Sequence, residues 1–275
     1  MKWTTVRPVA SKESFPGVRV AMVAAAVEAG NSRAEQWVLD LEDDGFCTVL
    51  WDKGNNVLYC SGSAEPSHTL SEGLDRLLLD VIRPQCLGTE RPYFSTKCLS
   101  HKLEDMWEYS VQPWLTGSHR KCFYERSWTQ ELPEGEMTKR LGFSVLPIDR
   151  SLLNDTALAN IDAIREEVSG MWPSLEAFCQ YGFGVAIAYK GEVLSWCTAE
   201  YVSDDRCGVG IETVESYQKQ GLATWLTHEF LLEAQRRRIN VGWECWAGNV
   251  ASIRVAEKCG FTLLEEGTML VGKFT

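Results

Sequence analysis

The chain has 275 residues, 45% of them apolar and 24% charged, which is typical of a globular protein that buries its own core. Its 38 acidic and 27 basic side chains give a formal net charge of −11. This acidity argues against a general nucleic-acid binder, which needs a basic face, and either favours a cationic partner or serves solubility alone.

The first half of the chain alternates between helix and strand patterns. Residues 16–30 predict a helix of small residues that ends at Gly30. Two apolar runs in residues 46–62 flank a Gly/Asn turn and predict a β-hairpin. Residues 70–82 have apolar side chains at helical spacing, with Ser71 as the expected N-cap. A strand, a helix and a strand are expected over 91–99, 101–115 and 120–128.

The acidic segment ELPEGE, residues 131–136, contains a Pro and a Gly and is the best candidate for a linker. We therefore expect an N-terminal α/β domain over 1–130, a linker and first strand over 131–140, and a second domain over 141–275. In this second domain we expect a helix, a strand–turn–strand, a strand, a helix, a strand, a helix and a hairpin, over 151–169, 182–199, 207–214, 222–238, 241–246, 251–259 and 261–274. Helices placed between strands of a mixed sheet indicate an α/β or α+β fold.

Ten cysteines are scattered along the chain without a C-x-x-C pair, and several lie in apolar runs. We expect buried, reduced thiols and a cytoplasmic location. The N-terminal residues have no signal-peptide core and no apolar run reaches 18 residues, so we expect no membrane span. The four histidines are too scattered to form a zinc site with these cysteines, and no metal is expected.

The most informative segment is 211–224, where a strand, a short polar loop and a helix N-terminus follow one another. The first turn of a helix has backbone N–H groups without intrahelical partners, and the helix dipole adds partial positive charge there. Gly221 permits close approach of a ligand, and Ala223 keeps the next turn small. The pattern predicts a cradle for a pyrophosphate, although it is neither a P-loop nor a G-x-G-x-x-G fingerprint.

Two motifs lie in order within residues 182–274. The first is Q-x-x-G-x-A, from Gln218 to Ala223, and the second is N-x-x-S-x-x-V-A-E-K-C-G-F, from Asn249 to Phe261. They resemble the acetyl-CoA signature and the helix motif of the GNAT superfamily of N-acetyltransferases. Within that superfamily, the chain is similar to the branch named for zwittermicin A resistance acetyltransferases.

The resemblance implies acetyl-CoA as co-substrate and assigns residues to it. Backbone groups near the strand end would meet the pantetheine arm, loop and helix amides would hold the pyrophosphate, and Asn249 would contact the pantetheine region. Lys219 is also consistent with a solvated loop cation, and Ser252 with a helix residue that bonds to its own chain. The cofactor-binding residues so implied are Thr213, Val214, Gln218, Lys219, Gln220, Gly221, Leu222, Ala223, Thr224, Asn249 and Ser252.

Acetyl transfer needs a base for the amine proton and an acid for the departing thiolate. Glu212 is the first candidate base, with Glu200 and Glu244 behind it, and burial would raise its pKa. Glu212 is equally consistent with an exposed carboxylate or one that orients the substrate. Many GNAT enzymes carry a tyrosine as general acid where this chain has Ala256, so Ser252 or a water must protonate the thiolate, or it leaves unassisted.

Three tryptophans, Trp196, Trp243 and Trp246, flank the expected acceptor cleft, and Trp243, Trp246 and Glu200 are the candidate substrate-binding residues. Most tryptophans are core residues by default. Trp243 and Trp246 bracket a short strand and cannot both point inward. Between them, Cys245 is expected to be buried rather than nucleophilic, because no histidine lies nearby in sequence.

The predicted activity is transfer of acetyl from acetyl-CoA to a primary amine by direct attack in a ternary complex. Residues 131–275 hold 21 acidic and 13 basic side chains, which favours a small cationic acceptor. A protein or peptide N-acetyltransferase and a non-catalytic acyl-CoA-binding module remain the alternatives. The N-terminal half, compatible with a degenerate GNAT-like lobe, carries no CoA motif. We expect no nucleic-acid or membrane partner, and a monomer or homodimer.

Overall fold

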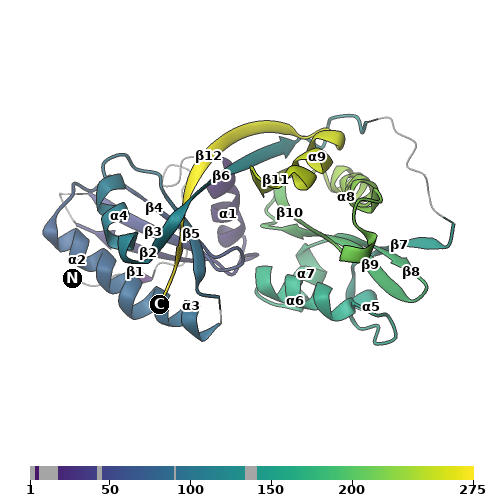
Figure 1. The fold of residues 1–275 in the computed structure, drawn as a ribbon, viewed down its shortest axis with the longest axis horizontal. Coiled ribbons are helices and arrows are strands. Elements are labelled where there is room, and N and C mark those ends of the chain that lie inside the picture. The colour runs from purple at the N-terminus through teal and green to yellow at the C-terminus, as the bar shows by residue number, and fades with distance from the viewer. Residues whose placement is uncertain (1–3, 6–17, 42–44, 90, 134–140) are drawn as a thin grey trace. The chain divides into compact units, whose positions relative to one another are not determined.

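A computed structural model describes residues 4–5, 18–41, 45–89, 91–133 and 141–275 (Figure 1). These residues divide into two compact units. Unit 1 consists of Met1–Glu28, Arg33–Arg120 and Gly267–Thr275, and unit 2 of Ala29–Ser32 and Lys121–Glu266. Each unit combines helices with a mixed sheet, which confirms the predicted fold class. The domain limits 1–130, 131–140 and 141–275 stay a prediction, and 134–140 lie outside the described residues.

Unit 1 is built on a sheet in the order β1-β2-β3-β4-β5-β12. In the described part of this sheet, β4 and β5 are parallel and the other neighbouring strands are antiparallel. The predicted hairpin is confirmed, because β3 and β4 pair from Asp52↔Val57 outward around the Gly/Asn turn. The strands are β1 Thr4–Thr5, β2 Glu35–Asp40, β3 Phe46–Asp52, β4 Val57–Gly62, β5 Tyr93–Cys98 and β12 Thr262–Lys273.

The helices of unit 1 are α1 Val18–Glu28, α2 His68–Arg76, a π-helical stretch Leu77–Ile82, α3 Arg83–Gly88, α4 Glu104–Val111 and a 3₁₀ turn Gln112–Trp114. The expectation that Ser71 caps the helix was wrong. The helix begins at His68, and the Ser67 hydroxyl accepts a 3.2 Å hydrogen bond from the Leu70 amide. Apolar side chains of α2 to α4, Leu74 and Trp107 among them, pack on the sheet to form one core.

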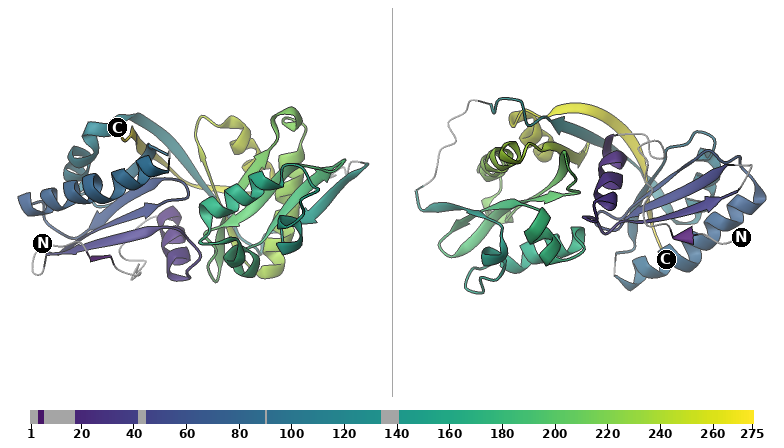
Figure 2. Two further views of the ribbon diagram at one scale, coloured as in Figure 1. Left: turned by 90° about the horizontal axis from the view of Figure 1, so that it is seen from below. Right: turned by 180° about the vertical axis from the view of Figure 1, so that it is seen from behind.

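Unit 2 has a sheet in the order β7-β8-β9-β10-β11-β6, in which only β10 and β11 are parallel. Its strands are β6 Leu115–Arg126, β7 Phe143–Pro147, β8 Gly184–Tyr189, β9 Glu192–Glu200, β10 Arg206–Thr213 and β11 Asn240–Trp246. Its helices are α5 Arg150–Leu153, α6 Ile161–Met171, α7 Leu175–Tyr181, α8 Leu222–Arg237 and α9 Val250–Lys258, with a 3₁₀ turn Glu215–Tyr217. Both views of Figure 2 place α8 and α9 on one face of this sheet and α5 to α7 on the other.

The two units repeat one order of elements. In each, an antiparallel run leads to a parallel strand pair bridged by a helical segment, and a further helix precedes the last strand. The last strands are exchanged along the chain: β6, from the middle, pairs with β11 in unit 2, and the end of β12 pairs with β5 in unit 1. The hairpin expected over 261–274 is therefore wrong, because β12 continues through Gly267 without a turn.

Two further expectations can be scored in this fold. The helix expected over 151–169 is interrupted: α5 ends at Leu153, and α6 begins after Asn160, whose φ of 66° breaks the helical path. All ten cysteines are free thiols, and all except Cys98 and Cys179 are buried, which confirms the expected burial for most of them. None of the described helices is long and apolar enough to cross a membrane.

Candidate active site

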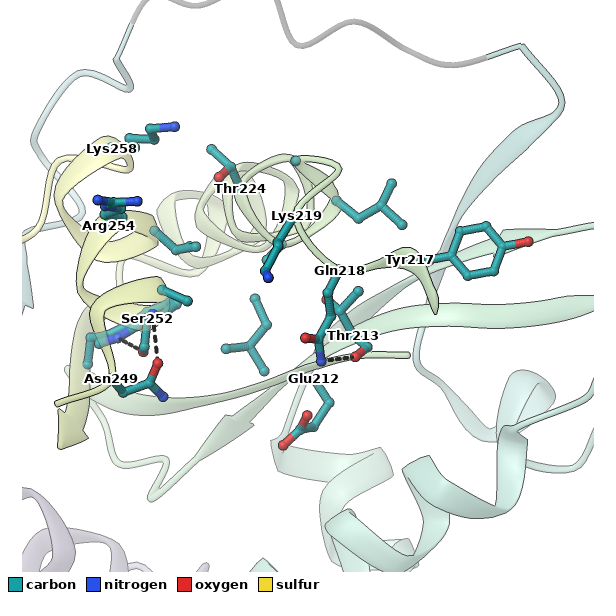
Figure 3. Close-up of a pocket in the computed structure, with 17 residues that line it drawn as sticks. Glu212, Thr213, Tyr217, Gln218, Lys219, Thr224, Asn249, Ser252, Arg254 and Lys258 are labelled. Carbon is teal, nitrogen blue, oxygen red and sulfur yellow. Dashed lines mark hydrogen bonds between the residues drawn. The ribbon is translucent and has the colours of Figure 1, made fainter. Parts of the chain in front are cut away.

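The site begins where two parallel strands separate. β10 and β11 pair only over their first three residues, from Arg206↔Asn240 to Gly208↔Gly242, although both strands continue. A cavity of about 670 Å³ lies beyond this point, between the ends of the strands and the helices α8 and α9 (Figure 3). Its lining residues are Ile211, Glu212, Thr213, Tyr217, Gln218, Lys219, Gly221, Leu222, Ala223, Thr224, Trp243, Asn249, Ala251, Ser252, Arg254, Val255 and Lys258.

One wall of the cavity is the N-terminus of α8. Gly221 precedes the helix with φ of 82°, in the left-handed region that glycine adopts without strain. No side chain caps this end of the helix. Leu222, Ala223 and Thr224 line the cavity, and the amides of this first turn have no intrahelical partners. This is the geometry that the sequence predicted for an anion cradle.

The loop before α8 is fixed by its own glutamines. Gln218 donates from Nε2 to the Thr213 carbonyl at 3.1 Å, and Gln220 donates to the Ser216 carbonyl at 3.1 Å. Lys219, with φ of 58°, extends into the cavity between them (Figure 3). Gln220 is not among the lining residues. Neither is Val214, whose amide donates to the Leu194 carbonyl of β9.

A second wall comes from the start of α9. Asn249 is the N-cap, and its Oδ1 accepts a 3.1 Å hydrogen bond from the Ser252 amide. The Ser252 hydroxyl accepts a 3.0 Å hydrogen bond from Nε1 of buried Trp243. The Asn249 amide group remains able to donate. The Ser252 hydroxyl also bonds to the Cys245 thiol, an interaction that opposes the rise in the pKa of that thiol caused by burial.

Glu212 marks the opposite end of the cavity from Lys258 (Figure 3). Its side chain is exposed, which is one of the alternatives that the sequence left open. Partial desolvation by the surrounding protein still raises the pKa of its carboxyl, against the opposing effect of the Thr213 amide. A carboxylate with this pKa, at the mouth of a cavity, is suited to accept a proton.

The sheet face that carries Glu212 holds two more carboxylates. Glu167 of α6 accepts hydrogen bonds from the Trp196 indole and the Thr198 hydroxyl, both at 2.6 Å. A Cβ atom at Gly210 would lie 2.5 Å from Oε1 of Glu200 and 2.9 Å from Oε1 of Glu167, so both acids lie over this glycine. Burial and the nearby charge of Glu212 raise the pKa of Glu167, while its two hydrogen bonds lower it.

Several predicted residues lie away from the cavity. Trp243 is 3% exposed and lines it, whereas Trp246 is 37% exposed and lies beside Lys121, which agrees with the expectation that the two cannot both point inward. Glu244 forms an ion pair with Lys121 at 3.1 Å. Neither Glu244, Glu200 nor Trp246 lines the cavity. Cys245 is buried as expected.

The sequence did not identify four residues of this region: Glu167, Tyr217, Arg254 and Lys258. The Tyr217 ring points away from Glu212 and Ser252 (Figure 3), and Ala256 is fully buried and does not line the cavity. Arg254 and Lys258 are four residues apart on a predicted helix, a signal that places both on one face. Within the described ranges, no group of three or more His, Cys, Asp or Glu side chains could hold a metal ion.

A family model described as GNAT acetyltransferase matches residues 94–270, more than half of the chain. The uncharacterized N-acetyltransferase YdfB of Bacillus subtilis is 31% identical over 141 residues, or 51% of this chain. The chain spans about half the length of this curated relative, 50%.

Two solved structures are similar in fold. One is a GCN5-related N-acetyltransferase-like protein from Streptococcus suis, with a TM-score of 0.60 and 16% identity over 92% of both chains. The other is a tandem GNAT protein from the clavulanic acid biosynthesis pathway, with a TM-score of 0.52 and 10% identity over 96% of this chain and 91% of that one.

Proposed function

The chain belongs to the GNAT acetyltransferase family, and we propose that it transfers acetyl from acetyl-CoA to the primary amine of a small, cationic acceptor. The observation that carries this proposal is the cavity itself. The N-terminus of α8, which has no side-chain cap, forms one wall of this cavity, and the exposed carboxylate of Glu212 lies at one end of it.

The N-terminal turn of α8 would hold the pyrophosphate of acetyl-CoA. Free amides and the helix dipole favour a doubly charged group there, and Lys219 adds a cation beside it. The pantetheine arm would then extend between β10 and β11 toward Asn249, which has an amide group free to donate. Thr213 and Val214 are proposed to contact this arm through their backbone; the bonds that Gln218 and Leu194 make to them would have to yield or be shared.

The proposed reaction is direct attack of the neutral amine nitrogen on the thioester carbonyl. A C–N bond forms, the C–S bond breaks, and Glu212 accepts the proton that the amine loses. The CoA thiolate takes a proton from the Ser252 hydroxyl or from water. The Ser252 oxygen accepts from Trp243 and its hydroxyl also bonds to Cys245, so its proton would have to leave that thiol to reach the CoA thiolate. No tyrosine is needed at Ala256 in this scheme.

The acceptor would approach the sheet face that carries Glu167, Glu200 and Glu212. Three carboxylates on one face favour a substrate with a positive charge besides its reacting amine. Glu200 and Trp243 are proposed to contact the substrate. Trp246 is proposed with less support, because it does not line the cavity and is 37% exposed. Peptides with a free amino terminus or lysine share this chemistry and form the second candidate class.

Unit 1 is proposed to be a degenerate GNAT-like lobe that does not bind CoA. The repeated order of elements supports a shared origin of the two units, and the likeness to a tandem GNAT protein agrees with it. The free thiols agree with a cytoplasmic location. Membership of the zwittermicin A resistance branch rests on the motif residues alone. A monomer or homodimer is proposed for its quaternary structure.

The test is a thiol-release assay with acetyl-CoA against small diamines, aminoglycosides and peptides. We expect release of CoA that depends on a small cationic amine, with one N-acetyl product per thiol. Turnover of peptides alone would instead establish the peptide acetyltransferase. Calorimetric binding of CoA without thiol release for any acceptor would establish the non-catalytic module, which the absence of an acid at Ala256 favours.

A further inference from the structure

Two cations of α9 line the same cavity as the N-terminus of α8. Arg254 and Lys258 are exposed, line the cavity, and form no ion pair or hydrogen bond with any residue that the structure describes. Arg150 and Arg238 also form no ion pair among the described residues, but they do not line the cavity. Four other arginines of this unit are paired. Arg165, Arg206, Arg236 and Arg237 are each held by a carboxylate within 3.2 Å.

The lack of a carboxylate partner is informative in a chain of this charge. The chain has 38 acidic side chains for 27 basic ones, so unpaired cations that share one cavity run against its composition. Lys258 lies in the last turn of α9, where a positive charge interacts favourably with the helix dipole. The dipole therefore accounts for the position of Lys258 but not for that of Arg254. Arg254, one turn earlier, gains little from the dipole, and both face the same cavity.

The position of Arg254 and Lys258 relative to α8 indicates which anionic group they could bind. The Cys259 thiol lies 3.8 Å from the Thr224 carbonyl, so the last turn of α9 packs beside the first turn of α8. The pair is thus next to the amides proposed for the pyrophosphate, and Glu212 lies at the other end of the cavity (Figure 3). In CoA, the anion next to the pyrophosphate on the side away from the thioester is the 3′-phosphate of the ribose.

We propose that Arg254 and Lys258 together bind the 3′-phosphate of CoA and so make the site selective for CoA over its 3′-dephospho form. The guanidinium offers a planar pair of donors and the ammonium a point charge, a combination that suits a dianionic phosphate. This inference rests on the proposed use of acetyl-CoA. It adds a third anion contact to the amides of α8 and to Lys219, which serve the pyrophosphate.

The test compares CoA with 3′-dephospho-CoA in calorimetric titrations of the full chain at about 50 mM salt. The wild type is expected to bind CoA about tenfold more tightly, the range of two solvent-exposed charge contacts. Arg254→Gln combined with Lys258→Gln should bind both ligands with the affinity of the wild type for 3′-dephospho-CoA. Lys219→Gln should weaken both ligands equally, because both contain the pyrophosphate.

A control of equal net charge is Arg150→Gln combined with Lys190→Gln, whose side chains do not line the cavity. It should keep the wild-type preference; the same loss of preference as in the test variant would overturn the inference. Equal binding of both ligands by the wild type would also overturn it, while leaving the proposed function intact. Failure of the wild type to bind either ligand would instead remove the proposed function.

Discussion

The two units share their order of elements but differ at the parallel strand pair. In unit 1, β4 and β5 pair over four residues, up to Cys60↔Cys98, and the Leu99 amide continues the pair with a 2.8 Å bond to the Cys60 carbonyl. In unit 2, β10 and β11 separate after Gly208↔Gly242, five residues before β10 ends at Thr213. The second arrangement leaves room for the cavity between the strand ends.

The helices α2 and α8, which follow β4 and β10, differ in how their N-termini are capped. Ser67 caps α2 and satisfies the Leu70 amide, whereas α8 begins at Gly221 without a side-chain cap. The residue before the end of β4 is Ser61, where β10 has Glu212. Three local features of unit 2 therefore distinguish the proposed site from the same frame in unit 1: an early strand separation, a helix end without a side-chain cap and a carboxylate.

Loss of the carboxylate should have the largest effect. Glu212→Gln removes the proposed base while keeping the size of the side chain, and we expect kcat to fall by about 10²–10⁴-fold. The affinity for CoA should not change, because Glu212 lies at the far end of the cavity from α8 and Lys258. Steady-state thiol release and calorimetry measure the two quantities.

The matched control for this variant is Glu215→Gln, in the exposed turn after β10 and outside the cavity lining. It should retain wild-type kcat. If Glu212→Gln kept full activity as well, the base would have to be sought elsewhere, with Glu167 first because it lies on the same face with a raised pKa.

Substitutions at the N-termini of α8 and α2 should change different properties: CoA binding for α8 and stability for α2. Gly221→Val forces a β-branched residue into the left-handed region at about 1–2 kcal/mol, and we expect it to weaken CoA binding by about tenfold or more as the loop shifts. Ser67→Ala in unit 1 should lower the free energy of unfolding by about 1 kcal/mol and leave CoA binding unchanged. Urea unfolding and calorimetry separate the two effects. Weaker CoA binding in Ser67→Ala would contradict the assignment of the site to unit 2.

Added salt should weaken the attraction between the carboxylates of unit 2 and a cationic acceptor. Raising ionic strength from about 50 to about 500 mM shortens the screening length severalfold, so the KM for a cationic acceptor should rise several-fold. An acceptor whose only charge is the reacting amine should show a smaller rise. A KM for the cationic acceptor that is independent of salt would show that Glu167, Glu200 and Glu212 do not select for charge.

The interaction between the carboxylates of Glu212 and Glu167 can also be measured by titration. The charge of Glu212 is one cause of the raised pKa of Glu167, so Glu212→Gln should lower the pKa of Glu167 toward that of free glutamate, about 4.3. Burial remains in this variant and should keep the pKa above that value. Carbon-13 NMR of labelled glutamate carboxyls measures the change. An unchanged pKa would mean that the two carboxylates do not interact.

Local sequence signals predicted the two helices beside the cavity well. The apolar spacing of residues 222–238, the glycine before them and Asn249 before the last helix place α8 and α9 within one residue of the structure. These signals act within one turn of the chain, so they need no knowledge of packing.

Features that depend on distant partners were not predictable in this way. Glu167 lies on an expected helix, but its bonds to Trp196 and Thr198 arise from packing of α6 on the sheet. A hairpin was expected over 261–274, whereas β12 is one continuous strand whose last residues pair with β5. Ser67 and Ser71 are both good N-caps, and only the observed start at His68 distinguishes them.

The central claim is that the chain binds one acetyl-CoA, in the cavity of unit 2. Calorimetric titration of the full chain with acetyl-CoA tests it most directly, on the wild type and on Gly221→Val. The account predicts one site per chain, with an affinity that falls by about tenfold or more in the variant. Two sites per chain, or one site whose affinity Gly221→Val leaves unchanged, would contradict it.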